Sequence, residues 1–334
     1  MAEAAFAFVD GVRAGVRGPA SIVDAFRLEY APREVLDRAA LALDIRFGRE
    51  TAHAAAVVEG RHKSVGWRIA LGPAGAAPIQ ADIHLRGMPR SFARSLVQGY
   101  AIEPLVSIVA AEHGQALVPS AGVARPTGVT LILGRSRAGK STLMARLMAA
   151  GHEVLGDDQL FLDASGACVA FPRRLRFYPD LETTAPAAYA RMPAAIRRRL
   201  RLMGLLSTVT RGHIRPSLAV DRTAIGGHWV PGPLPIERVV LLQRGDHAGE
   251  LRSAPASPEQ AVAWATRLLA EQRARLALSG EAGWRARLDR ASEAEVAILS
   301  DTFAGPAIVS ISVPHDWPAA AAVTAVARRL GLDV

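Results

Sequence analysis

The nine residues from Gly134 to Thr142 restrict the folds open to this chain more than any other segment. They read Gly-Arg-Ser-Arg-Ala-Gly-Lys-Ser-Thr and match the phosphate-loop pattern G-x-x-x-x-G-K-[ST] at every fixed position. The apolar residues 129–133 before the loop predict a strand, and residues 141–150 after it predict a helix that ends at Gly151. The segment therefore predicts a strand, a glycine-bearing loop and a helix that together bind a phosphate chain.

Each part of this loop has a physical role in phosphate binding. Backbone N–H groups and the helix N-terminus form a cradle for anions, and Gly134 and Gly139 allow the backbone to approach closely. We expect Lys140 to reach the β- and γ-phosphates of ATP, and Ser141 to offer its hydroxyl to Mg²⁺. The expected nucleotide-binding residues are Gly134, Arg135, Ser136, Arg137, Ala138, Gly139, Lys140, Ser141 and Thr142.

The choice of cation inside the loop stands out against the composition of the chain. Of 40 lysines and arginines, only Lys63 and Lys140 are lysines, and the formal net charge is +9. Such a preference for arginine is typical of a GC-rich genome, so the positive charge is weak evidence for nucleic-acid binding. A compact ammonium and a forked guanidinium are not interchangeable beside a phosphate chain. A lysine at position 140 therefore favours the phosphate-loop interpretation.

Two adjacent carboxylates, Asp157 and Asp158, follow Lys140 by 17 and 18 residues. Residues 152–155 predict a strand that returns along the strand of the loop and ends beside the phosphates. One carboxylate could then accept the proton of an attacking hydroxyl, and the other could hold Mg²⁺ or its waters. The alternative interpretation is a solvated Asp-Asp turn.

The run from Gly134 to Asp158 resembles the kinase domain of HPr serine kinase and its relatives, a domain similar in fold to phosphoenolpyruvate carboxykinase. In that family a phosphate loop is followed by a helix, a glycine turn and an acidic doublet at this spacing. The resemblance covers residues 115–175 best. It implies that Asp158 is the general base, that Asp157 supports it and holds the metal with Ser141, and that Lys140 is catalytic. The roles of the two aspartates could be exchanged.

The chain departs from the family pattern in three places. Arg137 stands where the family loop usually has glycine, and Pro119 and Ser120 occupy the region of a family histidine. The later glutamate motif that binds metal in the family is missing, because the surroundings of Glu182 do not match it. HPr itself is therefore not the expected acceptor. The chain looks more like divergent relatives, some of which phosphorylate a precursor peptide in peptide natural-product pathways.

The pattern along the chain predicts a mixed α/β protein with two domains. Residues 1–112 are expected to form an N-terminal α+β domain that recognises the acceptor or mediates assembly. Residues 113–334 are expected to form the HPr-kinase-like catalytic domain. Helices are predicted at 19–48, 90–111, 191–206, 258–275 and 318–330, and strands at 65–71, 115–118, 159–163, 167–171, 239–242 and 308–313.

Residues 191–222 hold eight arginines and a single acid, Asp221. This basic segment predicts either a surface for an acidic peptide or for nucleotide phosphates, or an ordinary solvated helix face. Arg173, Arg174 and Arg176 are better placed to touch phosphates. No aromatic residues alternate with these arginines, which argues against a platform for single-stranded nucleic acid.

The N-terminal residues 1–16 carry acids and lack the long apolar block of a signal peptide. The single cysteine, Cys168, forms no intramolecular disulfide and indicates a reducing compartment. No apolar run approaches the length of a membrane span. We therefore expect a cytoplasmic protein without a membrane partner.

The function favoured by the sequence is an ATP-dependent kinase for a serine or threonine hydroxyl of a peptide or protein, such as a natural-product precursor peptide. A kinase for a small-molecule hydroxyl would have the same site chemistry and stays open. A non-kinase phosphate-loop ATPase of the transporter type would need a Leu-Ser-Gly-Gly-Gln-type signature and an aspartate after a distant strand, and the chain shows neither. The expected cofactors are ATP and Mg²⁺, and assembly as a homo-oligomer stays open.

Overall fold

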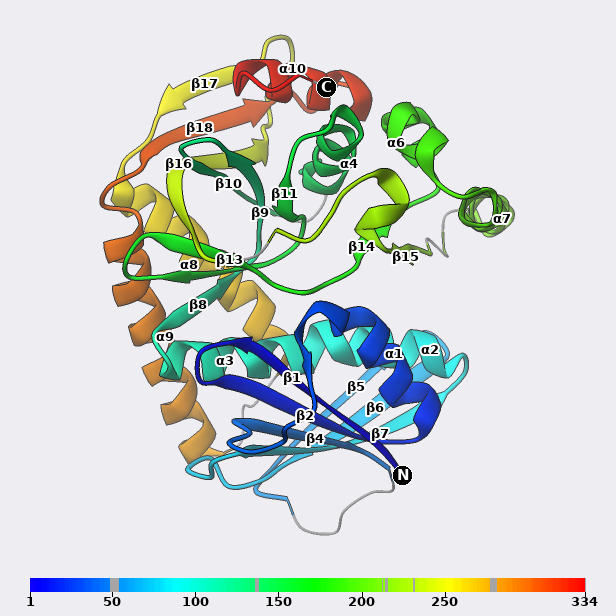
Figure 1. The fold of residues 1–334 in the computed structure, drawn as a ribbon, viewed down its shortest axis with the longest axis vertical. Coiled ribbons are helices and arrows are strands. Elements are labelled where there is room, and N and C mark those ends of the chain that lie inside the picture. The colour runs from blue at the N-terminus through cyan, green and yellow to red at the C-terminus, as the bar shows by residue number, and fades with distance from the viewer. Residues whose placement is uncertain are drawn as a thin grey trace. The chain divides into compact units, whose positions relative to one another are not determined.

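The computed structural model describes a mixed α/β protein, as the sequence predicts (Figure 1). The described residues are 1–48, 54–135, 138–211, 213, 216–230, 232–276 and 281–333. The chain divides into two compact units. Unit 1 comprises residues 1–117, 161–164 and 266–301, and unit 2 comprises residues 118–160, 165–265 and 302–334.

This division differs from the expected break after residue 112. The first unit extends to residue 117 and takes in residues 266–301, which the sequence assigned to the second domain. These residues hold most of the long helix α9 (Ala282–Thr302). Arg287 of this helix donates to both carboxylate oxygens of Glu112, over 2.6 and 2.8 Å. Glu112 and Arg287 are 175 residues apart in the chain, so no local sequence pattern could predict their contact.

Unit 1 is built on a mixed sheet that has seven strands within the described residues, in the order β3-β1-β2-β4-β7-β6-β5. The strands are β1 (Ala2–Val9), β2 (Val12–Gly18), β3 (Glu34–Val35), β4 (Leu43–Phe47), β5 (Ala56–His62), β6 (Val65–Leu71) and β7 (Ile79–Gly87). Its helical elements besides α9 are α1 (Ala20–Tyr30), η1 (Ala31–Arg33), α2 (Arg90–Val97), η2 (Gln98–Ile102), α3 (Glu103–Glu112) and η4 (Ala274–Leu276).

The helix predicted over residues 19–48 is wrong beyond α1. After Tyr30 the chain makes a short 3₁₀ turn and two strands, and Leu43 lies in β4, which pairs in parallel with β2 and β7. Leu36, expected on the apolar face, is fully exposed. The strand at 65–71 is confirmed by β6. The helical run at 90–111 is confirmed; it consists of α2, the π-helical turn η2 and α3, and Pro104 lies in the first turn of α3.

Unit 2 contains the strand order β11-β9-β10-β16, with β18 and β17 continuing beyond β16. Strands β10, β16 and β18 run parallel, and β9 and β17 run antiparallel to their neighbours. The strands are β9 (Ser120–Arg125), β10 (Gly128–Gly134), β11 (Val154–Gly156), β13 (Ala167–Ala170), β16 (Leu234–Arg244), β17 (Arg252–Pro255) and β18 (Ala307–Val313). Strands β8 (Gln115–Val118) and β12 (Leu160–Asp163) fall at the boundaries between the units.

Helices α4 and α10 share one apolar core with this sheet, and a small sheet of β14 and β15 lies against α4 (Figure 1). The remaining elements of unit 2 are α4 (Lys140–Ala150), β14 (Leu175–Phe177), α5 (Leu181–Thr184), α6 (Pro186–Arg191), α7 (Ala194–Val209), β15 (Leu218–Val220), η3 (Arg222–Ile225) and α10 (Ala319–Arg329). Helix α8 (Pro258–Arg273) begins in unit 2 and ends in unit 1. The predicted strands and helices of this half are confirmed to within a few residues, whereas α9, β9 and the β14–β15 pair were not predicted. Within the described residues, no helix combines the length and apolarity needed to cross a bilayer.

Candidate functional site

The phosphate-loop motif lies where its sequence predicts, between a buried strand and a helix. Strand β10 ends at Gly134, and α4 begins at Lys140 and stops before Gly151. Gly139 adopts φ +98°, a left-handed conformation that other residues rarely accept. A Cβ on Gly134 would lie 2.8 Å from the carbonyl oxygen of Leu242, so the loop leaves the sheet in close contact with β16. The structure therefore explains both fixed glycines of the motif: Gly139 by its left-handed backbone and Gly134 by its close contact with β16.

Lys140 is the cation at the base of this loop. Its side chain is buried, and its Nζ donates hydrogen bonds to the carbonyl oxygens of Gly134, at 2.5 Å, and Arg135, at 3.1 Å. Burial lowers the pKa of Lys140, whereas the charges of Asp158 and Asp157 raise it. An ammonium has three N–H donors, and a charged one at this depth is stabilised by an adjacent anion.

The other predicted loop residues are less constrained. Arg135 is exposed, and its carbonyl oxygen also accepts from the backbone N–H of Ala138 at 3.2 Å. Thr142 is half-buried in the first turn of α4. Ser136 and Arg137 lie outside the described residues.

The strand that leads to the acidic doublet has a different neighbour in the sheet from the one predicted. The strand expected over 152–155 is β11, but it does not lie directly along β10, because β9 lies between them. Since β9 is antiparallel to both neighbours, β10 and β11 run in the same direction and end at the same edge of the sheet. The backbone N–H of Ser120 donates to the carbonyl oxygen of Asp158 at 3.0 Å and fixes the end of this strand.

Asp157 faces the loop from its buried position. Burial raises the pKa of Asp157 to about 6, and the charge of Asp158 adds to this shift. A hydrogen bond from Ser141 and the charges of Arg173 and Arg222 act in the opposite direction. A hydroxyl and a carboxylate in contact are oxygen ligands of the kind that Mg²⁺ prefers. The described residues hold no cluster of three or more metal-binding side chains, and Mg²⁺ usually completes its shell with phosphate oxygens and water.

Asp158 is the more accessible carboxylate of the pair, since 48% of its side chain is exposed. Its Oδ2 accepts a hydrogen bond from Nη1 of Arg173, whose own side chain is mostly buried. Among the three arginines singled out around β14, Arg173 therefore contacts the doublet. The charge of Arg174 acts on Asp221: burial alone would raise the pKa of that carboxyl, but the Thr223 hydrogen bonds and the charges of Arg174 and Arg222 together lower it below its ordinary value.

Arg222 is a site residue that the sequence did not reveal. It is buried, and its Nη1 donates to the carbonyl oxygens of Val154, at 3.2 Å, and Leu155, at 3.1 Å. Its guanidinium carbon lies 4.8 Å from the ring centre of Trp229. Burial lowers the pKa of Arg222, and the charge of Asp157 raises it. Within the basic segment, nothing in the sequence separates this buried arginine from its exposed neighbours.

Five charged groups therefore gather at the carboxyl edge of the sheet in unit 2. The cations are Lys140, Arg173 and Arg222, and the anions are Asp157 and Asp158. With every group ionised, the cluster has one surplus positive charge, which favours an anionic ligand. Glu182 does not belong to this cluster, because its carboxylate pairs with Arg201 over 2.7 Å.

No family model matches the chain, and no curated protein matches it. The geometry and charge of this cluster are therefore the guide to the function of this chain.

We expect Asp157→Asn to stabilise the ligand-free protein at neutral pH. The raised pKa of Asp157 means that the folded state binds a proton more tightly than the unfolded state, so stability falls as pH rises from about 4 to about 6. Asparagine removes this cost, with a gain of about 1–3 kcal/mol above pH 6 and none near pH 4. Urea unfolding in the presence of a chelator at both pH values measures the difference. A variant that is less stable than the parent protein at pH 7.5 would contradict the prediction.

Proposed function

We propose that this chain is an ATP-dependent kinase that transfers the γ-phosphoryl group to a serine or threonine hydroxyl of a peptide or protein. The observation that carries the proposal is that Ser141 donates a hydrogen bond to Asp157, and that the charges of Asp157 and Asp158 act on the buried Lys140. A phosphate loop alone fits any nucleotide-binding protein. A carboxylate pair beside it adds a base and a metal ligand, which are the parts that phosphoryl transfer to a hydroxyl requires.

The polyphosphate of ATP would bind at the N-terminus of α4. The free N–H groups and the dipole of this helix favour negative charge there. Lys140 would donate to phosphate oxygens, and Arg173 and Arg222 would keep the surroundings positive. The residues present therefore fit a nucleotide phosphate chain.

Mg²⁺ would be held by the Ser141 hydroxyl and the Asp157 carboxylate. Their contact and the burial of Asp157 support this assignment, because a carboxylate removed from water is stabilised by a cation. When bound, the ion would neutralise charge on the phosphate oxygens.

Asp158 would serve as the base. Its half-exposed carboxylate is open to an incoming hydroxyl, whereas the buried Asp157 is engaged with Ser141. Asp158 would take the hydroxyl proton as the acceptor oxygen bonds to the γ-phosphorus. The bond from that phosphorus to the β–γ bridging oxygen breaks, and ADP leaves with the electron pair. Arg173 would hold the carboxylate in position.

We also propose that unit 2 has the arrangement of the HPr-kinase-like catalytic domains. The order of β10, loop, α4, β11 and acidic doublet supports this, as does the placement of both strand ends at one edge. Ser120 is buried and donates to the carbonyl oxygen of Val118 at 3.0 Å, in the region of the family histidine. A serine in such a contact is a weak base, so we expect no phosphatase activity of the type attributed to that histidine.

Incubation with radiolabelled ATP and Mg²⁺ tests the proposal. We expect label to transfer to serine- or threonine-containing peptides encoded beside this gene, detected as a mass increase of one phosphoryl group. Matched peptides with alanine in place of serine and threonine serve as controls. Label transferred to sugars or metabolites instead would favour the small-molecule alternative. Phosphate released at the same rate without any acceptor would favour the ATPase alternative.

A further inference from the structure

Helix α7 carries an exposed face that the phosphate site does not use. Taking 100° per residue, Ala195, Arg198, Leu202, Leu205 and Val209 fall on one side of the helix. Leu205 and Val209 are 64% and 81% exposed, and the neighbouring Leu206 is also exposed. We call the side formed by these six residues the α7 outer face.

The opposite side of α7 is anchored in unit 2, so the outer face points away from the core. Leu200 is buried, and α7 packs against β15. A Cβ on Gly204 would lie 3.3 Å from the Cβ of Pro179, so the helix also contacts the segment after β14. Amphipathic helices in globular proteins normally expose polar residues on the side that faces water. Three exposed leucines and a valine on two successive turns are therefore typical of a surface that binds a partner.

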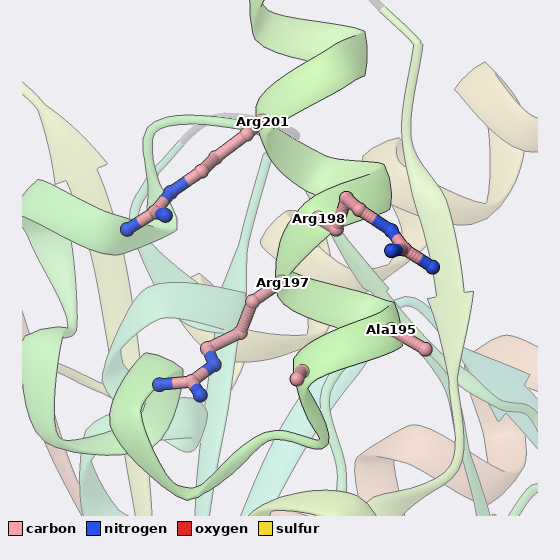
Figure 2. A pocket seen from close by; sticks show the side chains of 5 residues that line it. Ala195, Arg197, Arg198 and Arg201 are labelled. Atoms are coloured by element: carbon pink, nitrogen blue, oxygen red, sulfur yellow. The ribbon is translucent and has the colours of Figure 1, made fainter.

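Arginines surround the outer face. Arg197, Arg198, Arg199 and Arg201 lie on the first two turns, and no acidic residue occurs between Glu182 and Asp221. Figure 2 shows Arg197 and Arg201 extending to one side of the helix and Arg198 to the other. A hollow of about 430 Å³ lies beside the first two turns of α7. It is lined by Ala194, Ala195, Arg197, Arg198 and Arg201.

Most of this positive charge is not balanced within the described residues. Arg201 pairs with Glu182, but both side chains are largely exposed, and such a pair contributes little. In the part of the chain that the structure describes, Arg197, Arg198 and Arg199 form no ion pair. The hollow thus combines small apolar walls with cations available to a ligand.

We propose that the α7 outer face docks an acidic, leucine-bearing segment of the peptide acceptor, an inference that rests on the proposed kinase function. Leucines of the acceptor would cover Leu202, Leu205 and Val209, and its carboxylates would pair with the surrounding arginines. Charge complementarity selects an acidic partner, and the apolar stripe selects one with aliphatic side chains.

An anionic membrane surface is the main competitor and fits the outer face less well. Helices that lie in membranes usually carry an apolar face along their length, often with tryptophan or phenylalanine. Here the apolar residues cover only two turns and include no aromatic residue, and Arg198 interrupts the face. The arginine-lined hollow is also concave, which suits inserted side chains better than a bilayer.

The α7 outer face lies in the same unit as the phosphate loop, and a short segment of chain connects helix α7 to the acidic doublet. Arg173 contacts Asp158, and six residues later Pro179 lies against α7. A chain of this length spans at most about 20 Å. This segment therefore links the carboxylate pair to the anchored side of α7 within unit 2.

Fluorescence anisotropy of a labelled synthetic peptide, in which leucine and glutamate recur at three- and four-residue spacing, tests the docking. We expect binding to full-length protein without nucleotide, weakened about tenfold by Arg198→Glu with Arg199→Glu and by Leu205→Ser with Leu206→Ser. Added salt should weaken peptide binding more for the parent protein than for the arginine variant. A peptide with lysine in place of glutamate should not bind.

Matched controls keep the result interpretable. Arg290→Glu changes an exposed arginine of α9, and Leu36→Ser changes an exposed leucine of unit 1; neither should alter binding. Circular dichroism verifies that each α7 variant is folded. Equal binding by parent and folded α7 variants overturns the proposal. So does failure of the acidic peptide to bind, whether or not the protein binds phosphatidylglycerol vesicles.

A variant of the phosphate site separates this inference from the proposed function. Lys140→Met should bind the acidic peptide as the parent protein does, because docking does not require nucleotide. If the parent protein binds the peptide through α7 but transfers no phosphate to any acceptor, the kinase proposal fails and the docking face remains. If transfer occurs and α7 variants show unchanged KM for the peptide, the docking proposal fails alone.

Discussion

Replacing Lys140 by methionine is expected to lower nucleotide-dependent phosphoryl transfer by about a thousandfold, a loss of the size seen when one preorganised donor to a developing negative charge is removed. The ammonium is buried at the loop and contacts the carbonyl oxygens of Gly134 and Arg135. Methionine has a similar length and no charge, so it preserves packing while removing the donor. Transfer measured with radiolabelled ATP, together with nucleotide affinity from equilibrium dialysis, gives the result.

Lys140→Arg is expected to fail almost as completely, although it keeps the charge. A planar guanidinium is bulkier than an ammonium and cannot occupy the buried space between two carbonyl groups of the loop. The only other lysine provides a matched control: Lys63 is exposed on a turn of unit 1 with φ +55°, and Lys63→Met should retain full transfer. Normal turnover by either Lys140 variant would show that the loop does not bind the transferred phosphate.

Local sequence signals predicted the strand and helix on either side of the phosphate-loop motif because the pattern that marks them is itself local. The strand β10 and the helix α4 follow one another closely in the chain, and the apolar run, the fixed glycines and the helix pattern that predict them all lie between residues 128 and 151. The helix forecast at 19–48 failed for the opposite reason. Val35 and Leu43 have helical spacing, but their conformation is decided by pairing with β1 and with β2 and β7, which no local period encodes.

The rest of the site depends on contacts between distant segments. Asp157 and Asp158 were predicted as a pair, but the strand β9 that separates β11 from the loop strand was not. Arg222 lies 65 residues after Asp157 and was hidden among exposed arginines of the basic segment. Arg222 is buried with its guanidinium against the ring of Trp229, and this burial arises only when the chain folds. Sequence patterns could therefore name the groups that carry negative charge, but not all the cations that balance them.

Asp158→Asn is expected to lower the turnover number by about a hundred- to ten-thousandfold, the usual contribution of a positioned base, while nucleotide affinity changes little. Asparagine keeps the shape of the side chain and can still accept a hydrogen bond from Arg173, so the local geometry should persist. Asp289→Asn, an exposed change on α9, is a suitable control. Single-turnover transfer at saturating ATP and Mg²⁺ separates this chemical defect from weak binding.

The same assay decides which aspartate is the base. If Asp157 and Ser141 hold the metal together, Asp157→Asn should raise the Mg²⁺ concentration needed for half-maximal rate. Excess Mg²⁺ should then restore part of the activity. No concentration of Mg²⁺ should restore Asp158→Asn, because the missing group accepts a proton. The opposite pattern would exchange the two roles, and normal turnover by Asp158→Asn would remove the base from the mechanism altogether. Arg173→Gln adds a further distinction: it leaves the carboxylate in place, so its loss of turnover should be smaller than that of Asp158→Asn, and smaller again when Asp158 is already asparagine.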